Sequence, residues 1–411
     1  MPIERAAKPL PTWSDIASDF DRHTAMNAVV AWLYAITGPL AILFAALNDA
    51  KLEHGVVASW IFGCYAIGGL LSVIMSCLYR QPIAMAWSIP AVMLAGPALG
   101  HLSLSEVIGA YVVAGAIIAL IGLSGGIGKA MRYVPAPILM GMVCGVFLPF
   151  GLKIITGFQN DFLIAATVTI AFVAASMVPR IGRVLPPVLI ALVIGFGVVI
   201  ANGQLVPTQP VELGLVQPLW FTPSFSVRAQ VELVVPLIVT VIGIHNPQGF
   251  AVLSEAKYAA PVNAMTFASG IGSVVSAFVG GGSICVAGPS NALLCSSGQP
   301  HQRYVGGIVF GSLMMAFGIA APMAVSLSLS LPVTFISVLG GLAILRVLQG
   351  WMASAFGGAL GLGALVAFLV TMSGIVVFHI SAPFWGVVAG MATSLLLERS
   401  ALRQSWAQEA S

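Results

Sequence analysis

Long apolar stretches alternate with short polar segments along most of the chain. A helix needs about 20 apolar residues to cross the hydrocarbon of a bilayer. The pattern predicts an all-α polytopic membrane protein with fourteen segments, at 26–47, 57–77, 82–98, 104–123, 134–152, 161–178, 185–201, 229–252, 262–279, 283–298, 304–322, 331–350, 358–377 and 382–398. A proline-bearing connection, 202–225, divides them into two repeats of seven, 26–201 and 226–398, between terminal segments 1–25 and 399–411.

Composition supports a lipid environment. The 411 residues are 59% hydrophobic and only 7% charged, whereas soluble domains carry about 25% charged residues. Most of the surface must therefore face lipid. No basic run indicates a nucleic-acid partner.

The basic residues give an orientation. With a cytoplasmic N-terminus, three of them fall outside: Lys51, Lys153 and Arg228. Thirteen fall inside: Arg5, Lys8, Arg22, Arg80, Lys129, Arg132, Arg180, Arg183, Lys257, Arg303, Arg346, Arg399 and Arg403. This bias follows the positive-inside rule and predicts cytoplasmic termini in a bacterial-type inner membrane.

The two groups of seven segments share a pattern of helix breakers, with offsets between 195 and 208 residues. The matched pairs are Gly38-Pro39 with Asn246-Pro247, Trp87–Pro90 with Ala287–Ser290, and Pro137–Gly145 with Pro332–Gly340. Because each half has an odd number of segments, the halves run in opposite directions. The pattern predicts an inverted repeat.

The third and tenth segments contain too many breakers for one unbroken helix each. Pro90 and Pro289 fall mid-segment, so we expect a short extended piece followed by a half-helix that begins at each proline. Both half-helices then begin near the bilayer midplane. Each helix start offers free amides and about half a positive charge, which suits an anion. Ordinary spans with proline kinks are the alternative.

The eighth segment carries three polar side chains within four positions, His245, Asn246 and Gln248. Such groups are costly inside a membrane unless they serve a function. Histidine exchanges a proton near neutral pH, and no carboxylate falls at mid-membrane. His245 therefore carries the proton in a coupled mechanism, or the substrate is carried protonated. A histidine satisfied by a neighbouring helix is the plainer interpretation. Tyr34 of the first segment is a further cavity-facing candidate.

Several motifs resemble the benzoate:proton symporter family. They are Ala86-Trp87-Ser88-Ile89-Pro90, the run from Asn246 to Leu253 with Ala256 and Tyr258, and Arg303-Tyr304. Two departures stand near the expected site. His245 replaces the family's usual glutamine, with one residue inserted before Gly249, and Ser283–Val286 replaces a His-Ala-Val-Asn-like stretch.

The resemblance extends in architecture to uracil permease and the sulfate/bicarbonate transporters. It implies a core domain (segments one to four and eight to eleven) that moves against a gate domain (five to seven and twelve to fourteen). It also implies homodimers through the gate and a substrate between the two half-helices.

Together these features predict proton-coupled symport of a small aromatic or organic carboxylate such as benzoate. The predicted substrate site comprises Tyr34, Ser88, Ile89, His245, Asn246, Gln248, Gly288, Ser290 and Asn291. A nucleobase symporter, an inorganic-anion exchanger and an anion channel on this scaffold stay open as alternatives. The sequence lacks a His-Glu-x-x-His motif, and we expect no enzyme activity, metal or cofactor.

Overall fold

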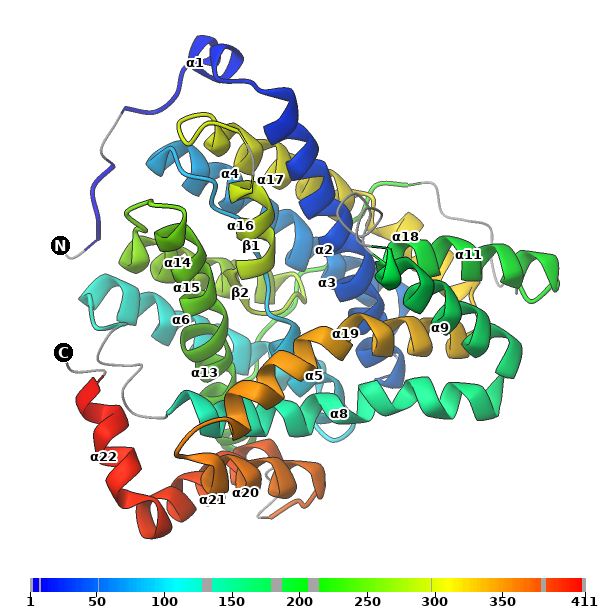
Figure 1. Cartoon of the computed structure of the whole chain (residues 1–411), viewed down its shortest axis with the longest axis vertical. Helices are drawn as coiled ribbons and strands as arrows, with labels where there is room; N and C mark the ends of the chain where they lie inside the picture. Colours follow the sequence, from blue (N-terminus) through cyan, green and yellow to red (C-terminus); the bar gives the residue numbers. More distant parts are fainter. Residues whose placement is uncertain are drawn as a thin grey trace.

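The computed structural model describes residues 3–6, 9–50, 52–127, 135–178, 187–205, 214–296, 298–377 and 382–408. Helices account for most of these residues, as predicted (Figure 1). Six basic residues used above for the orientation lie outside the described ranges: Lys8, Lys51, Lys129, Arg132, Arg180 and Arg183.

The first half follows the predicted order of segments after a short N-terminal helix, α1 (Trp13–Ser18). Its elements are α2 (Arg22–Asp49), the joined helices α3 (His54–Phe62), η1 (Gly63–Ile67) and α4 (Gly68–Tyr79), strand β1 (Met85–Trp87) with α5 (Ile89–Ala98), α6 (Leu104–Ser124), α8 (Ala136–Asn160), α9 (Phe162–Met177) and α11 (Pro187–Ala201).

The second half repeats this order. Its elements are the joined helices α12 (Val227–Ala229), η2 (Gln230–Val234), α13 (Val235–Val239), η3 (Thr240–His245) and α14 (Asn246–Glu255), then α15 (Val262–Phe278), strand β2 (Ile284–Val286) with α16 (Gly288–Cys295), α17 (Arg303–Ile319), α18 (Ala321–Leu329), α19 (Val333–Phe356), α20 (Gly361–Met372), α21 (Ala382–Leu397) and α22 (Arg399–Gln408).

Two of these helices go beyond the prediction. The predicted segment 304–322 ends early, and α18 leaves α17 at an angle of 63°. Pro322 stands at the second position of α18, where its missing N–H cannot continue the preceding helix. The terminal segment 399–411 forms α22 over most of its length.

Helix length bears on the number of membrane crossings. Within the described ranges, five helices are long and apolar enough to cross a membrane, or up to seven if each bent pair counts as one span. Other predicted segments correspond to shorter apolar helices, such as α5 and α11. The number of fourteen spans therefore stays a prediction, while each predicted segment overlaps a helix or a strand–helix unit.

The two broken segments meet as an antiparallel strand pair. Met85 pairs with Val286, Ala86 with Cys285 and Trp87 with Ile284. Antiparallel pairing between the third segment of one half and the third segment of the other is the arrangement that an inverted repeat requires.

Serine side chains from matched helices secure the strands. Ser72 of α4 accepts a hydrogen bond from the Met85 amide at 2.8 Å. Ser273 of α15 accepts one from the Ile284 amide at 2.9 Å. Extended backbone at membrane depth survives only where its polar groups find such partners. The second and ninth segments thus perform the same task in each half.

The helices form two packed groups. The first helix group contains α2–α6 and α12–α17 with both strands, and its closest pairings are α6 with α15 and α4 with α17. The second helix group contains α8, α9, α11 and α19–α21, with α19 and α20 packed on α8. Figure 1 shows the second group along the lower and right side of the molecule. Helix α19 also packs on α2, which joins the groups.

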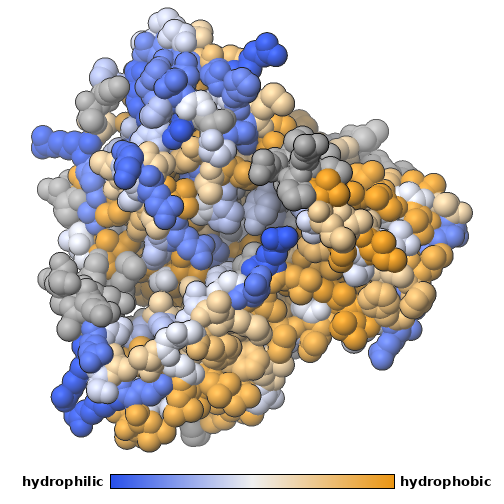
Figure 2. Space-filling model, viewed as in Figure 1, coloured by the Kyte–Doolittle hydropathy of each residue, from blue (hydrophilic) through white to orange (hydrophobic). Residues whose placement is uncertain are grey.

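Surface hydropathy agrees with a lipid environment. Figure 2 shows hydrophobic residues over α8, α9 and α11, and hydrophilic residues near α1 and α22. Exposed apolar side chains include Phe162, Ile170 and Met177 of α9 and Val193 of α11.

Polar side chains of the N-terminal segment bind the first helix group through hydrogen bonds and an ion pair. Glu4 accepts hydrogen bonds from the amides of Asn263 and Ala264, each at 3.0 Å, at the start of α15. Asp15 forms an ion pair with Arg80 at 2.7 Å, and the Tyr304 hydroxyl donates to Asp19 at 2.9 Å.

Candidate functional site

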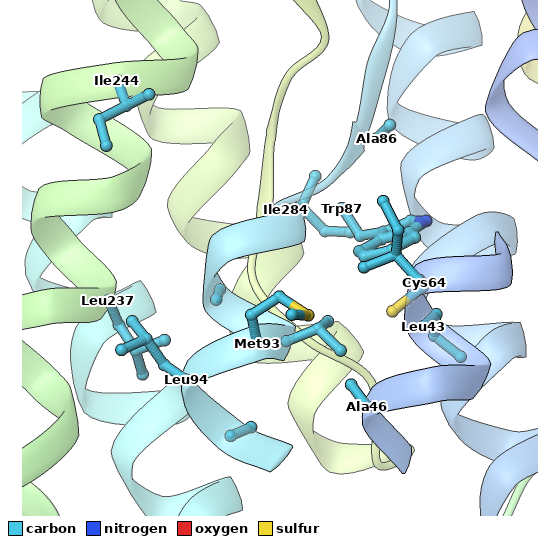
Figure 3. Packing of buried hydrophobic residues seen from close by; sticks show 14 of the residues in the cluster. Leu43, Ala46, Cys64, Ala86, Trp87, Met93, Leu94, Leu237, Ile244 and Ile284 are labelled. Atoms are coloured by element: carbon cyan, nitrogen blue, oxygen red, sulfur yellow. The ribbon is translucent and has the colours of Figure 1, made fainter. Parts of the chain in front are cut away.

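A cavity lies where the paired strands face the second helix group. It encloses about 370 Å³, within the usual range of about 300–1,000 Å³ for small-molecule sites. A second cavity of about 840 Å³ shares Tyr34, Pro39, Ile89, Arg346 and Trp351 with the first. Figure 3 shows the packing behind the strands, with Met93 of α5 between Leu43 of α2 and Leu237 of α13.

Both half-helices begin directly after the strand pair. Ser88 caps α5 by accepting a hydrogen bond from the Ala91 amide at 3.3 Å, and prolines occupy the second position of α5 and of α16. The first amides of a helix have no partner within it. Since Pro90 and Pro289 carry none, the amides left for a ligand are those of Ile89, Gly288 and Ser290.

His245 is positioned by an unusual turn of its own helix. It is the last residue of the π-helical turn η3, two positions before Pro247. Such turns often occur at functional sites. Its Nδ1 lies 3.0 Å from the Thr240 carbonyl oxygen and 3.4 Å from Ser88 Oγ. Because a carbonyl only accepts, Nδ1 carries the proton in the neutral ring, and Nε2 is the basic nitrogen.

Two predicted site residues hold the strands instead of lining the cavity. Asn246 Oδ1 accepts a hydrogen bond from the Val286 amide at 2.9 Å. Asn291 Oδ1 accepts one from the Ala84 amide at 2.7 Å. Both side chains are fully buried. Each asparagine thus satisfies a buried backbone amide that would otherwise be unpaired, one within β2 and one directly before β1.

The nine predicted residues divide into two sets. The first set lines the smaller cavity: Tyr34, Ile89, His245, Gln248 and Ser290. The second set stands behind its wall: Ser88, Asn246, Gly288 and Asn291. The structure brings all nine to one region, but it places the second set in supporting positions rather than at the cavity surface.

The second helix group contributes cavity residues that the sequence analysis missed. From α19 come Arg346, Gly350, Trp351 and Ser354, and from α8 comes Met140. Arg346 belongs to the predicted segment 331–350 and served there only as an inside charge for the orientation; the structure places it within α19 on the wall of both cavities. A lone arginine inside an apolar stretch was the signal available.

A buried acid lies away from this region. The carboxylate of Glu232 is fully buried, and its oxygens lie 3.0 and 3.1 Å from His101 Nε2. Neither residue lines the two cavities. Within the described ranges, His245 and Arg346 are the ionisable side chains on the cavity walls, apart from the phenol of Tyr34 and the thiol of Cys285.

Solved structures share this architecture. The transmembrane domain of a cyanobacterium bicarbonate transporter, BicA, aligns with a TM-score of 0.59 at 15% identity, covering 94% of this chain and 99% of that one. The murine Solute Carrier 26 family member A9 anion transporter, in its inward-facing state, gives 0.62 at 13% identity, covering 96% and 73%. At these identities the likeness establishes the fold alone.

An inverted repeat of apolar helices with two short paired strands gives the chain the multi-pass membrane fold with core and gate domains of these two structures. The family match identifies the class of protein as a membrane transporter. Residues 18–396 match the family described as benzoate membrane transport protein. The chain belongs to that family.

Two relatives extend over nearly the whole chain. The inner membrane protein YdcO of Escherichia coli is 29% identical over 389 residues, covering 93% of this chain and 98% of the relative. A benzoate membrane transport protein of Acinetobacter baylyi is 28% identical over 392 residues, covering 93% and 97%.

Proposed function

We propose that the protein takes up a small aromatic or other organic carboxylate, such as benzoate, together with a proton. The observation that carries this proposal is the meeting of two helix starts and His245 at one cavity. Membership of the benzoate membrane transport family supports the substrate class. The relative from Acinetobacter baylyi, named as a benzoate transporter, supports it further.

In this mechanism the carboxylate receives hydrogen bonds from the free amides of Ile89 and Ser290, the two residues at the helix starts that line the cavity. Gln248 and Tyr34 lie on the same wall and set the orientation of the substrate. The Ser88 hydroxyl and the Asn246 and Asn291 amides hold the backbone that presents those donors.

His245 carries the coupled proton. With Nδ1 held by the Thr240 carbonyl, proton uptake occurs at Nε2 and places a positive charge beside the cavity. That charge favours the anion, so substrate and proton bind together. Release of the proton on the other side weakens the site for the anion.

Alternating access then follows from movement between the two helix groups. The first group corresponds to the core domain and the second to the gate domain. We further propose that the gate domains of two copies form a homodimer. The termini face the cytoplasm in an inner membrane, the location that the name of the relative from Escherichia coli gives for that protein.

Uptake of labelled benzoate into proteoliposomes tests this function. An inward-directed proton gradient should drive accumulation above equilibrium, and a protonophore should abolish it. Equal uptake with and without the gradient would exclude the coupling. No uptake of any aromatic carboxylate would exclude the substrate class.

An inorganic-anion exchanger is the second candidate, favoured by the likeness in fold to the bicarbonate transporter. A thermal-shift comparison of benzoate, bicarbonate, sulfate and uracil separates the candidates, because a ligand that binds the folded state raises its unfolding temperature. The proposal expects the shift with benzoate.

A further inference from the structure

Arg346 is the one charged side chain in the sequence of α19, which runs from Val333 to Phe356. The helix bends by 42° between Val333–Arg346 and Leu348–Phe356. Arg346 therefore stands at the bend, and its side chain is exposed to the space of both cavities. A guanidinium stays charged under all conditions relevant to a protein.

No carboxylate of the described residues pairs with Arg346. Among the residues that the structure describes on the walls of the two cavities, there is no aspartate or glutamate. An uncompensated arginine within the span of a membrane helix is costly, and such residues mark substrate or ion pathways. The charge of Arg346 thus calls for an anion that enters the cavity from outside the protein.

The opposite wall belongs to the other helix group. His245, Gln248 and Ser290 come from the first group, and the free helix amides lie at the same wall. Arg346, Gly350 and Trp351 come from α19 in the second group. An anion in this cavity therefore lies between donors of one group and a fixed positive charge of the other.

We propose that Arg346 is the carboxylate-recognition residue contributed by the second helix group. The guanidinium pairs with the substrate carboxylate while the helix amides hold the same group from the other side. The inference rests on the proposed function, because it assumes a carboxylate in this cavity. The bound anion then links the two groups, and a neutral molecule of the same shape does not.

The chemistry of arginine sets what this residue selects. Its planar fork matches a carboxylate with two parallel hydrogen bonds, which a lysine cannot reproduce. Arg346 therefore distinguishes a carboxylate from its uncharged amide. Trp351, five residues further along α19 on the same wall, faces the part of the substrate beyond that group.

Binding of benzoate and of benzamide, its neutral isostere, tests this role in purified full-length protein at pH 7. We compare the wild-type protein with Arg346→Gln, Arg346→Lys and a matched control, Arg403→Gln. Arg403 is an exposed arginine of α22 away from the cavities. Hydrogen bonds to charged groups are worth enough to predict a loss of about 10- to 100-fold in benzoate affinity for Arg346→Gln.

The expected result is specific to charge. Arg346→Gln weakens benzoate and leaves benzamide unchanged, so the preference for the anion disappears, while Arg403→Gln matches the wild-type protein. Arg346→Lys keeps the preference but binds benzoate about tenfold more weakly, since it retains the charge and loses the fork. If Arg346→Gln does not fold, the lysine variant decides: benzoate affinity equal to wild type overturns the inference.

Two further outcomes overturn the inference alone. One is wild-type benzoate affinity in Arg346→Gln, and the other is an equal loss for benzoate and benzamide, which would indicate a packing role. A wild-type protein that binds no carboxylate overturns the proposed function, and this inference with it.

Discussion

The two walls of the cavity are built differently. On the strand side, backbone groups are tied by Ser72, Ser273, Asn246 and Asn291 through buried hydrogen bonds. On the α19 side, the contact with the first group uses small residues, where a Cβ atom added to Gly38 would lie 3.2 Å from the Ala343 methyl group. Directional bonds fix a geometry, whereas apolar contacts between small residues permit sliding. The strand side is therefore suited to hold ligand groups in place, and the α19 side is suited to the movement proposed above.

Loss of one buried hydrogen bond on the strand side of the cavity should destabilise the protein. Asn291→Ala leaves the buried Ala84 amide without its acceptor, which costs about 1–3 kcal/mol. We expect a lower thermal unfolding midpoint in detergent and loss of benzoate binding. Asn202→Ala, at an exposed position beyond α11, is the control. A variant as stable as this control would show that the strands hold without Asn291.

Proton coupling should disappear when His245 is replaced. His245→Ala removes the group that takes up the proton, so accumulation should no longer follow the gradient. For one proton per substrate, one pH unit drives about tenfold accumulation, or about 1.4 kcal/mol. Uptake into proteoliposomes at several imposed gradients measures this. His54→Ala, at the exposed start of α3, should behave as the wild type. Gradient-driven accumulation in His245→Ala would remove that histidine from the mechanism.

Replacement of Trp351 in α19 should cost less stability than replacement of Asn291 beside the strands. Trp351 packs edge-on against Phe147 of α8, with ring centroids 4.9 Å apart. Trp351→Leu loses an aromatic pair worth about 1 kcal/mol and widens the cavity, so larger substituted benzoates should bind. Competition binding measures this selectivity. Trp220→Leu breaks a stacked pair with Phe278 away from the cavity and should leave selectivity intact. Unchanged selectivity in Trp351→Leu would contradict the placement of the substrate.

The smallest expected effect concerns the ion pair between Asp15 of the N-terminal segment and Arg80. Hydrogen bonding from the Thr12 backbone and the nearby Arg80 guanidinium lower the pKa of Asp15 below its ordinary value of 3.8. A lowered folded-state pKa means that the stabilising contact is present above pH 3.8 and is lost as the pH falls further. Limited proteolysis should cleave Asp15→Asn faster than wild type at pH 7, with the difference vanishing in acid. Equal cleavage at pH 7 would assign no anchoring role to this pair.

Much of the architecture could be predicted from helix breakers. Pro90 and Pro289 predicted the half-helices, because proline lacks a backbone N–H and favours the first turn of a helix. The extended pieces before them form an antiparallel pair, as an inverted repeat requires. The orientation of individual side chains was less predictable. Asn246 and Asn291 are polar residues beside a predicted site, and nothing in the sequence distinguishes an amide that binds substrate from one that binds a strand.

Arg346 shows a second limit. Within the predicted segment 331–350 its charge served only to orient the chain, and only the structure, in which α19 and the paired strands line one cavity, shows the space in front of Arg346. Helix α18 was missed for a related reason: apolar composition alone does not indicate that a chain turns by 63° before the next segment.

The strand pair also constrains how the chain is made. Met85–Trp87 leaves the ribosome long before Ile284–Val286, its hydrogen-bonding partner. Until the later residues are inserted, the peptide groups of the earlier strand lack hydrogen-bonding partners, because lipid supplies neither donors nor acceptors. A truncated product that ends after the first seven segments should therefore be unstable and a substrate for membrane proteases.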